Sequence, residues 1–128
     1  MPSPRLLLID SNSAFLRTTT QLLEPKFDVV AAFQDGAAAL REVLTFAPDI
    51  ILLEVYLGDY NGFEIARRIR LLGSKAKLVF LSLHSYPEFV HAAQSIGAAG
   101  YIFKSRTGSD LVRGIEAVAA GQEFFSED

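Results

Sequence analysis

The stretch Ile50-Ile51-Leu52-Leu53-Glu54 joins four consecutive aliphatic residues to a carboxylate. The run is too short for a helix and is apolar on both faces, which is typical of the central strand of a parallel sheet with helices on both sides. Open α/β sheets place their ligands at the carboxyl ends of the strands. We therefore expect Glu54 to lie at the edge where a site would form.

Four further runs have the character of strands, and amphipathic segments with helical spacing separate them. This alternation indicates βαβ units with right-handed crossovers. The sequence therefore predicts an α/β protein with a flavodoxin-like (βα)5 doubly wound fold, whose five-stranded parallel sheet has the order 2-1-3-4-5. Residues 1–128 are expected to form one domain, with Phe124-Phe125 on the core or leading into a further domain. The expected strands are Arg5–Asp10, Phe27–Phe33, Ile50–Glu54, Leu78–Ser82 and Gly100–Lys104.

Residues that cap helices precede these amphipathic segments. They are Ser11–Ser13, Asp35, Asn61, Ser85 with Glu88, and Thr107 with Asp110.

The composition narrows the class of protein. The chain has no cysteine, which excludes disulfides and thiolate metal sites and fits a cytoplasmic setting. No apolar run reaches the ~18 residues of a membrane span, so no membrane association is expected. The net charge of -3 argues against direct nucleic-acid binding by this segment.

Four of the expected strands end in a polar side chain: Asp10, Glu54, Ser82 and Lys104. In the order 2-1-3-4-5 the first and third strands are neighbours, so Asp10 and Glu54 should face each other. The fifth strand lies roughly 10 Å from the third, and a lysine side chain can span much of that gap. Ser82 is expected between Lys104 and Glu54.

Five motifs follow one another along the chain: Leu8-Ile9-Asp10, Pro48 to Glu54, Asn61-Gly62, Leu81-Ser82 and Gly97 to Lys104. In the order and spacing of these motifs, and over essentially its whole length, the chain resembles a response-regulator receiver domain of two-component signalling. The Leu81-Ser82-Leu83-His84 segment and Lys104-Ser105 are most similar to the LuxR/NarL-type subfamily, which carries a C-terminal helix-turn-helix DNA-binding domain. Whether such a domain follows residue 128 is left open.

The resemblance implies a phosphorelay mechanism rather than an enzyme. In the family, an aspartate at the end of the third strand accepts a phosphoryl group from a sensor histidine kinase, and paired acids after the first strand hold Mg²⁺. Glu54 takes the phosphoacceptor position here. Asp10, Glu54 and the backbone of Tyr56 would hold the metal. A histidine kinase or other signalling protein is the implied partner, and a homodimer is possible for this family.

Three further residues match the parts of the family that bind the phosphoryl group and respond to it. Ser82 and Lys104 would bind the phosphoryl oxygens, and Tyr101 would change rotamer together with Ser82.

Two central positions depart from the family pattern. Glu54 replaces aspartate, and its carboxylate reaches roughly 1.5 Å further. An error of ~1 Å in reactive geometry can cost ~10²-fold in rate. Ser11 replaces the second acid, so Mg²⁺ binding is expected to be weakened but not abolished. Gly58 also stands where the loop usually has proline. The sequence therefore predicts a pseudo-receiver that is hard to phosphorylate.

The longer side chain also carries its charge toward Lys104 and Ser82. We therefore expect Glu54 to imitate a phosphorylated aspartate in part and to bias the domain toward its active conformation. This hypothesis expects Tyr101 to point outward and Ser82 to be pulled toward Glu54.

Two other functions compete with this interpretation. A flavodoxin-like domain that binds a small ligand needs a phosphate-binding loop after the first strand, but Asp10-Ser11-Asn12-Ser13 has no glycine and begins with an acid. An aspartyl-phosphate phosphatase needs a nucleophilic aspartate with a second acid two residues on, and Glu54-Val55-Tyr56 has neither.

Overall fold

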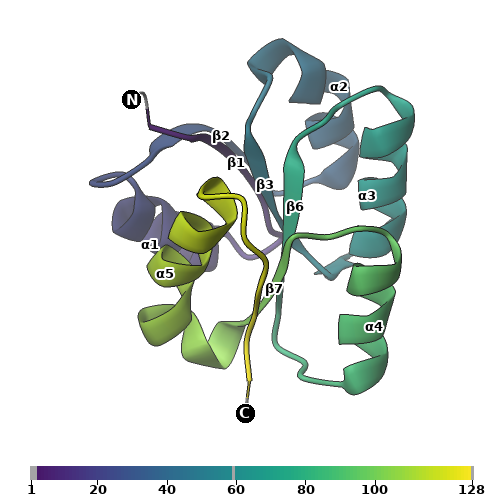
Figure 1. The fold of residues 1–128 in the computed structure, drawn as a ribbon. Helices are drawn as coiled ribbons and strands as arrows, with labels where there is room; N and C mark the ends of the chain where they lie inside the picture. Colours follow the sequence, from purple (N-terminus) through teal and green to yellow (C-terminus); the bar gives the residue numbers. More distant parts are fainter. Residues whose placement is uncertain (1–2, 59, 128) are drawn as a thin grey trace.

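A central sheet with helices on both faces forms the protein in the computed structural model, which describes residues 3–58 and 60–127 (Figure 1). The sheet is parallel and its strand order is β2-β1-β3-β6-β7-β8. The α/β flavodoxin-like fold is confirmed, and the first five strands of this order are the predicted 2-1-3-4-5. The strands are β1 (Arg5–Ile9), β2 (Asp28–Phe33), β3 (Ile50–Glu54), β6 (Lys77–Ser82), β7 (Gly100–Phe103) and β8 (Phe124–Phe125).

The sixth strand corrects the predicted count of five. Phe124-Phe125 extends the sheet beyond β7 instead of only covering the core. The backbone N–H of Phe124 donates to the carbonyl of Ala99 at 3.0 Å, and that of Ser126 donates to Tyr101 at 2.8 Å. A pair of phenylalanines is too short to show the alternating pattern of a strand, so the sequence could not distinguish a strand from a tail.

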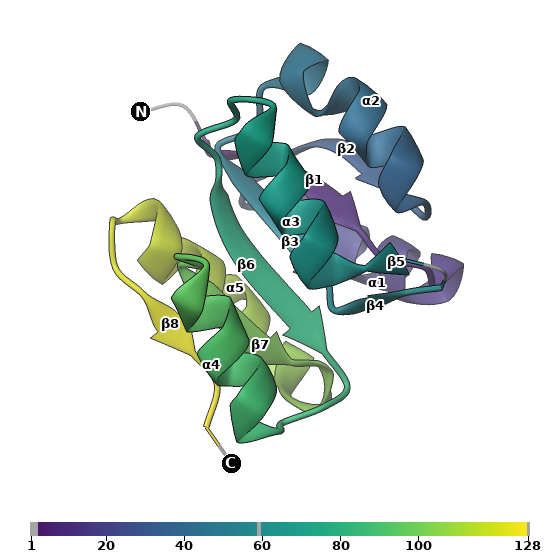
Figure 2. The ribbon, with the colours of Figure 1, turned by 90° about the vertical axis from the view of Figure 1, so that its right-hand side faces the viewer.

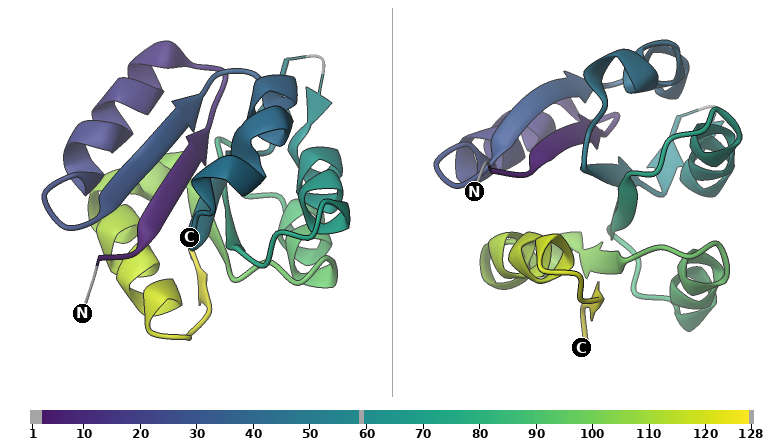
Figure 3. Two further views of the ribbon diagram at one scale, coloured as in Figure 1. Left: turned by 90° about the horizontal axis from the view of Figure 1, so that it is seen from above. Right: turned by 45° about the horizontal axis from the view of Figure 1, so that its top comes forward.

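Helices cover the sheet in two layers. The first layer is α1 (Ser13–Leu23) and α5 (Thr107–Ala119), and the second is α2 (Gly36–Phe46), α3 (Gly62–Leu71) and α4 (Pro87–Ser95). The two layers lie on opposite faces of the sheet in Figure 2 and in both views of Figure 3.

The central strand β3 packs against both helix layers, as its sequence predicts. Its five residues are all buried. Ile51 and Leu53 pack under α2 and α3, whereas Ile50 and Leu52 pack under α1 and α5. Burying one such aliphatic side chain contributes about 1.5–3 kcal/mol, so two separate cores hold β3 in the middle of the sheet.

Side-chain caps start three of the helices as predicted. Asn12, Asp35 and Asn61 each accept a hydrogen bond from a backbone N–H of the first turn, at 2.9, 3.1 and 2.7 Å. The predicted caps at Ser85 and Thr107 are wrong, because α4 and α5 begin without a side-chain cap. The hydroxyl of Thr107 instead donates to a backbone carbonyl in the preceding 3₁₀ turn.

The segment after β3 is more ordered than the predicted loop. It forms two short antiparallel strands, β4 (Tyr56–Leu57) and β5 (Tyr60–Asn61). Gly58 between them has φ of 63°. Proline fixes φ near about -65°, so the proline usual in the family could not adopt this turn. Asp59 lies outside the described residues.

The buried carboxylate of Asp110 stabilises the edge of the sheet at β8. From the sequence, Asp110 was expected only as a residue at the start of a helix. Asp110 accepts hydrogen bonds from Ser126 at 2.7 Å, Arg106 at 3.0 Å and Arg113 at 3.1 Å. Ser126 in turn accepts from the N–H of Phe103 at 3.1 Å. Burial by itself would raise the pKa of Asp110, but hydrogen bonds from Ser126, Arg106 and the other donors lower it overall.

We expect Asp110→Asn to destabilise the protein by about 1.5–3 kcal/mol at pH 7, because hydrogen bonds to a charged acceptor are lost. The folded pKa of Asp110 lies below its unfolded value. Its contribution is therefore present above about pH 4 and disappears as the pH falls through the folded pKa. Urea unfolding of both proteins at pH 7 and pH 3 measures this. An equal difference in stability at the two pH values would contradict the assignment.

Candidate functional site

Three charged side chains from separate parts of the chain meet at the carboxyl ends of the strands. Asp10 follows β1, Glu54 ends β3 and Lys104 follows β7. Ile9 pairs with Leu53 across β1 and β3, which places Asp10 and Glu54 side by side. The predicted convergence of these groups is therefore confirmed.

Lys104 lies between the two carboxylates. Its Nζ donates a hydrogen bond to Glu54 Oε1 at 2.9 Å and lies 2.8 Å from Asp10 Oδ2. The approach to Asp10 is not aligned as a hydrogen bond, so this second contact is an ion pair only. The three side chains are 3% (Asp10), 11% (Glu54) and 7% (Lys104) exposed. Nζ also lies 4.2 Å from the centre of the Phe15 ring, in a cation–π contact.

Ser11 holds the other oxygen of Glu54. Its backbone N–H and its hydroxyl both donate to Glu54 Oε2, at 3.0 and 2.8 Å. From the sequence, Ser11 was expected only as the replacement of an acid, and this contact was not predicted. The sequence signal for this contact was a hydroxyl at position 11 together with a glutamate at position 54. An acid at position 11 would have repelled Glu54, whereas a hydroxyl can donate to it.

Two predicted site residues do not join this cluster. The hydroxyl of Ser82 accepts from the N–H of His84 at 3.0 Å, and no hydrogen bond joins it to Glu54 or Lys104 in the described chain. Tyr101 is fully buried and donates through its hydroxyl to the carbonyl of His84 at 3.0 Å. The expectation that Tyr101 points outward and Ser82 is pulled toward Glu54 is therefore wrong. Glu54 already has its two oxygens bound by Lys104 and Ser11, so it exerts no pull on Ser82.

The pKa values of the two carboxylates are shifted in opposite directions. Burial raises the pKa of Asp10 and the negative charge of Glu54 adds to this, although Lys104 and the N–H of Asn12 oppose it. Burial acts the same way on Glu54, but the hydrogen bonds from Lys104 and Ser11 outweigh it and lower the pKa of Glu54. Glu54 is therefore the carboxylate that the cluster keeps ionised most firmly.

The sequence matches the family described as response regulator receiver domain over residues 6–116. The chain belongs to this family.

Relatives of this receiver domain are LuxR/NarL-type response regulators. It is 30% identical to the transcriptional regulatory protein DegU of Brevibacillus brevis over 122 residues, which cover 94% of this chain and 52% of DegU. It is 29% identical to the nitrate/nitrite response regulator NarL of Escherichia coli over 124 residues, which cover 95% of this chain and 57% of NarL. The chain therefore spans little more than half the length of these relatives.

A solved structure supports the same assignment. The crystal structure of a two-component response regulator of the LuxR family from an Aurantimonas species superposes with a TM-score of 0.92 and 31% identity, over 98% of this chain and 91% of that one. The predicted family, subfamily and fold are thus confirmed, and the domain is a receiver of two-component signalling.

Mg²⁺ at the phosphorylation site is a general property of receiver domains, and the residues of this one fit it poorly. Asp10 Oδ2 is buried and makes no hydrogen bond, as a metal ligand would. The ammonium of Lys104 lies 2.8 Å from that oxygen, however, and the oxygens of Glu54 are engaged by Lys104 and Ser11. Within residues 3–58 and 60–127 there is no cluster of three acidic or imidazole groups that could hold a metal. The backbone of Tyr56 as a ligand remains a prediction.

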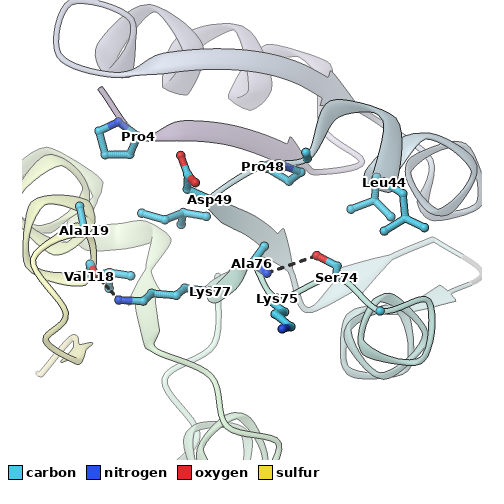
Figure 4. Close-up of a pocket in the computed structure, with 14 residues that line it drawn as sticks. Pro4, Leu44, Pro48, Asp49, Ser74, Lys75, Ala76, Lys77, Val118 and Ala119 are labelled. Carbon is cyan, nitrogen blue, oxygen red and sulfur yellow. Dashed lines mark hydrogen bonds between the residues drawn. The ribbon is translucent and has the colours of Figure 1, made fainter. Parts of the chain in front are cut away.

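A cavity lies at the opposite edge of the sheet from these residues, where the strands begin (Figure 4). It has a volume of about 630 Å³ and is lined by the segments before β1, β3 and β6 together with the end of α5. Lys77 at its wall donates to the carbonyl of Val118 at 3.1 Å. No helix in the described parts of the chain is long and apolar enough to cross a membrane.

Gly62 allows the chain to pass close behind Glu54. A Cβ at this position would lie 2.1 Å from the backbone oxygen of Glu54. We expect Gly62→Ala to cost about 1–3 kcal/mol, because the β3 end must move to admit the methyl group. Gly108→Ala is the matched control, since a Cβ there meets open space. The measurement is chemical denaturation, and equal stability of Gly62→Ala and wild type would contradict the close approach.

Proposed function

We propose that this protein is a pseudo-receiver: a receiver domain of two-component signalling in which Glu54 occupies the phosphoacceptor position and is not phosphorylated. The observation that carries the proposal is the engagement of the carboxylate on both sides, by Lys104 at 2.9 Å and by Ser11 at 2.8 Å. These are the directions from which an ordinary receiver would engage its phosphoryl group and its metal. Ser82 and Tyr101 keep their family positions, and their roles in switching remain part of the proposal.

The charge of the cluster supports an arrangement that is stable without phosphate. One ammonium is shared by the two carboxylates, and Ser11 supplies two further donors, both neutral, to Glu54. A phosphoryl group on Glu54 would replace the single charge of this carboxylate with about -1.5 to -2, beside the buried carboxylate of Asp10. Phosphorylation would also have to break the contacts of Lys104 and Ser11 with Glu54, so the site opposes the modification.

The partner of such a module is another signalling protein. Receivers interact with histidine kinases, and we infer that this domain contacts a kinase or another regulator through its surface without accepting its phosphoryl group. The relatives are named as transcriptional regulators. We therefore place this domain in transcription control, in a pathway whose signal is protein association or protein level rather than phosphate.

Acetyl phosphate with Mg²⁺, followed by intact mass, tests the proposal. The wild-type chain should keep its mass under conditions in which a receiver with an ordinary acceptor aspartate is modified. A stoichiometric gain of about 80 Da on residue 54 would overturn it.

A further inference from the structure

The α3 end of the molecule is strongly basic in a chain of net charge -3. Residues 67–77 carry five basic side chains and no acidic one. The neighbouring helix α2 adds one base and one acid, Arg41 and Glu42. Glu64 pairs with Arg67 and Arg68 on α3 and balances only part of this charge. From α2 through residue 77, omitting the segment between the two helices, six basic side chains thus stand against two acidic ones.

The same surface exposes large apolar side chains. Leu71 is 81% exposed, and Leu72 and Leu44 are also exposed. Leu71 and Leu72 end α3, and Leu44 lies in the last turn of α2. Apolar side chains gathered within a charged rim are typical of a surface that binds another macromolecule.

A groove runs between α2 and α3 at this surface, and the two helices lie side by side in Figure 2. Its volume is about 410 Å³, and its lining is Leu40 and Arg41 from α2 with Arg68, Leu71 and Leu72 from α3 and its end. Each helix thus supplies one arginine and at least one leucine. Ion pairs of the described residues leave Arg41 without an acidic partner.

We propose that this groove binds an amphipathic helix of a partner protein, with apolar side chains on one face and acidic side chains along both flanks. The leucines would take the apolar face, and Arg41 and Arg68 would each meet one acidic flank. The lining from Arg68 to Leu72 runs roughly 6 Å along α3 and its end, which matches about one turn of a partner helix. Helix-in-groove recognition uses this combination of a hydrophobic floor and charged edges.

The concave shape favours a helix over a lipid surface. A membrane-binding face inserts a convex apolar ridge with basic side chains around it. Here the apolar side chains line a groove whose walls come from two helices, and an arginine stands on each wall. The groove is formed by residues outside the Asp10–Glu54–Lys104 cluster, so this proposal does not depend on whether Glu54 is phosphorylated.

The test uses a synthetic peptide with leucine on one helical face and glutamate on both flanks, titrated into the whole chain by calorimetry. A second peptide with lysine in place of glutamate is the charge control. The glutamate peptide should bind and the lysine peptide should not. Arg41→Glu/Arg68→Glu and, separately, Leu71→Ser should each weaken binding by about tenfold or more.

Two variants elsewhere on the surface are the matched controls, because they make the same kinds of substitution outside the groove. Leu83→Ser alters a leucine that is 77% exposed, and Arg17→Glu reverses an exposed charge on α1. Both should leave the affinity unchanged, and all variants should unfold at the wild-type temperature. The proposal is overturned if the peptide does not bind, or if the control variants weaken binding equally. It is also overturned if phosphatidylserine vesicles, duplex DNA or a second copy of the chain occupies the surface in place of the peptide.

Discussion

The double variant Ser11→Asp/Glu54→Asp will accept a phosphoryl group from acetyl phosphate, whereas the wild-type chain will not. Shortening residue 54 by one carbon withdraws its carboxylate by roughly 1.5 Å and frees Lys104 to meet the phosphoryl oxygens. An acid at position 11 replaces the hydroxyl donor with a ligand that Mg²⁺ prefers, while the backbone N–H stays. The two changes thus restore both missing parts of the family's site.

The expected readout is a mass gain of about 80 Da in the presence of Mg²⁺. Correcting a misplacement of this size should raise the phosphorylation rate by at least about 10²-fold over wild type. Ser11→Asp/Glu54→Ala is the control, since it keeps the new metal ligand and removes the acceptor. A double variant that folds but gains no mass would show that something besides these two residues blocks the site.

Lys104→Met will be the most damaging single change to the charged cluster. It leaves Asp10 and Glu54, which are 3% and 11% exposed, without their shared cation. Removing one partner of a buried ion pair costs about 3–5 kcal/mol. Thermal and urea unfolding at pH 7 measure the loss.

A second substitution distinguishes the effect of the uncompensated negative charge from a general disruption of packing at the site. Adding Glu54→Gln to Lys104→Met removes one uncompensated charge and should recover a large part of the stability. Lys26→Met is the matched control, because Lys26 pairs with Glu116 at 3.9 Å on an exposed surface and such pairs contribute about 0–1 kcal/mol. No recovery in the double variant, or an equal loss in the control, would contradict the account of the cluster.

The sequence predicted the sheet and the position of the site because both follow from local patterns. The aliphatic run before Glu54 and the acid after Leu6–Ile9 identify neighbouring strands and place their carboxyl ends together. The position of Lys104 then follows from the strand order and the length of its side chain. The extra strand at Phe124–Phe125 did not follow, since two residues carry no period.

The hydrogen bonds within the site could not be predicted from the sequence. Sequence reasoning interpreted Ser11 as a loss of charge, but the structure uses its hydroxyl and N–H as donors to Glu54. It also placed Ser82 beside Glu54, although the hydroxyl binds the backbone of the turn after β6. Which of several donors a carboxylate selects depends on side-chain directions that strand order alone does not determine.

The departures at positions 11 and 54 therefore form a pair. A longer carboxylate needs a donor where the family has an acid, and Ser11 is that donor at 2.8 Å. Restoring the family's acid at only one of the two positions should therefore destabilise the site more than restoring both. Ser11→Asp by itself would set a third carboxylate beside Asp10 and Glu54 with only Lys104 to balance them.

The most direct test of this account is a crystal structure of the wild-type chain grown with Mg²⁺ in excess. We expect Lys104 Nζ to remain within hydrogen-bond distance of Glu54 and in contact with Asp10, with the Ser11 hydroxyl on the other Glu54 oxygen. A metal ion held by Asp10 and Glu54, with Lys104 displaced and Ser11 turned away, would contradict the claim that these residues close the phosphoacceptor position.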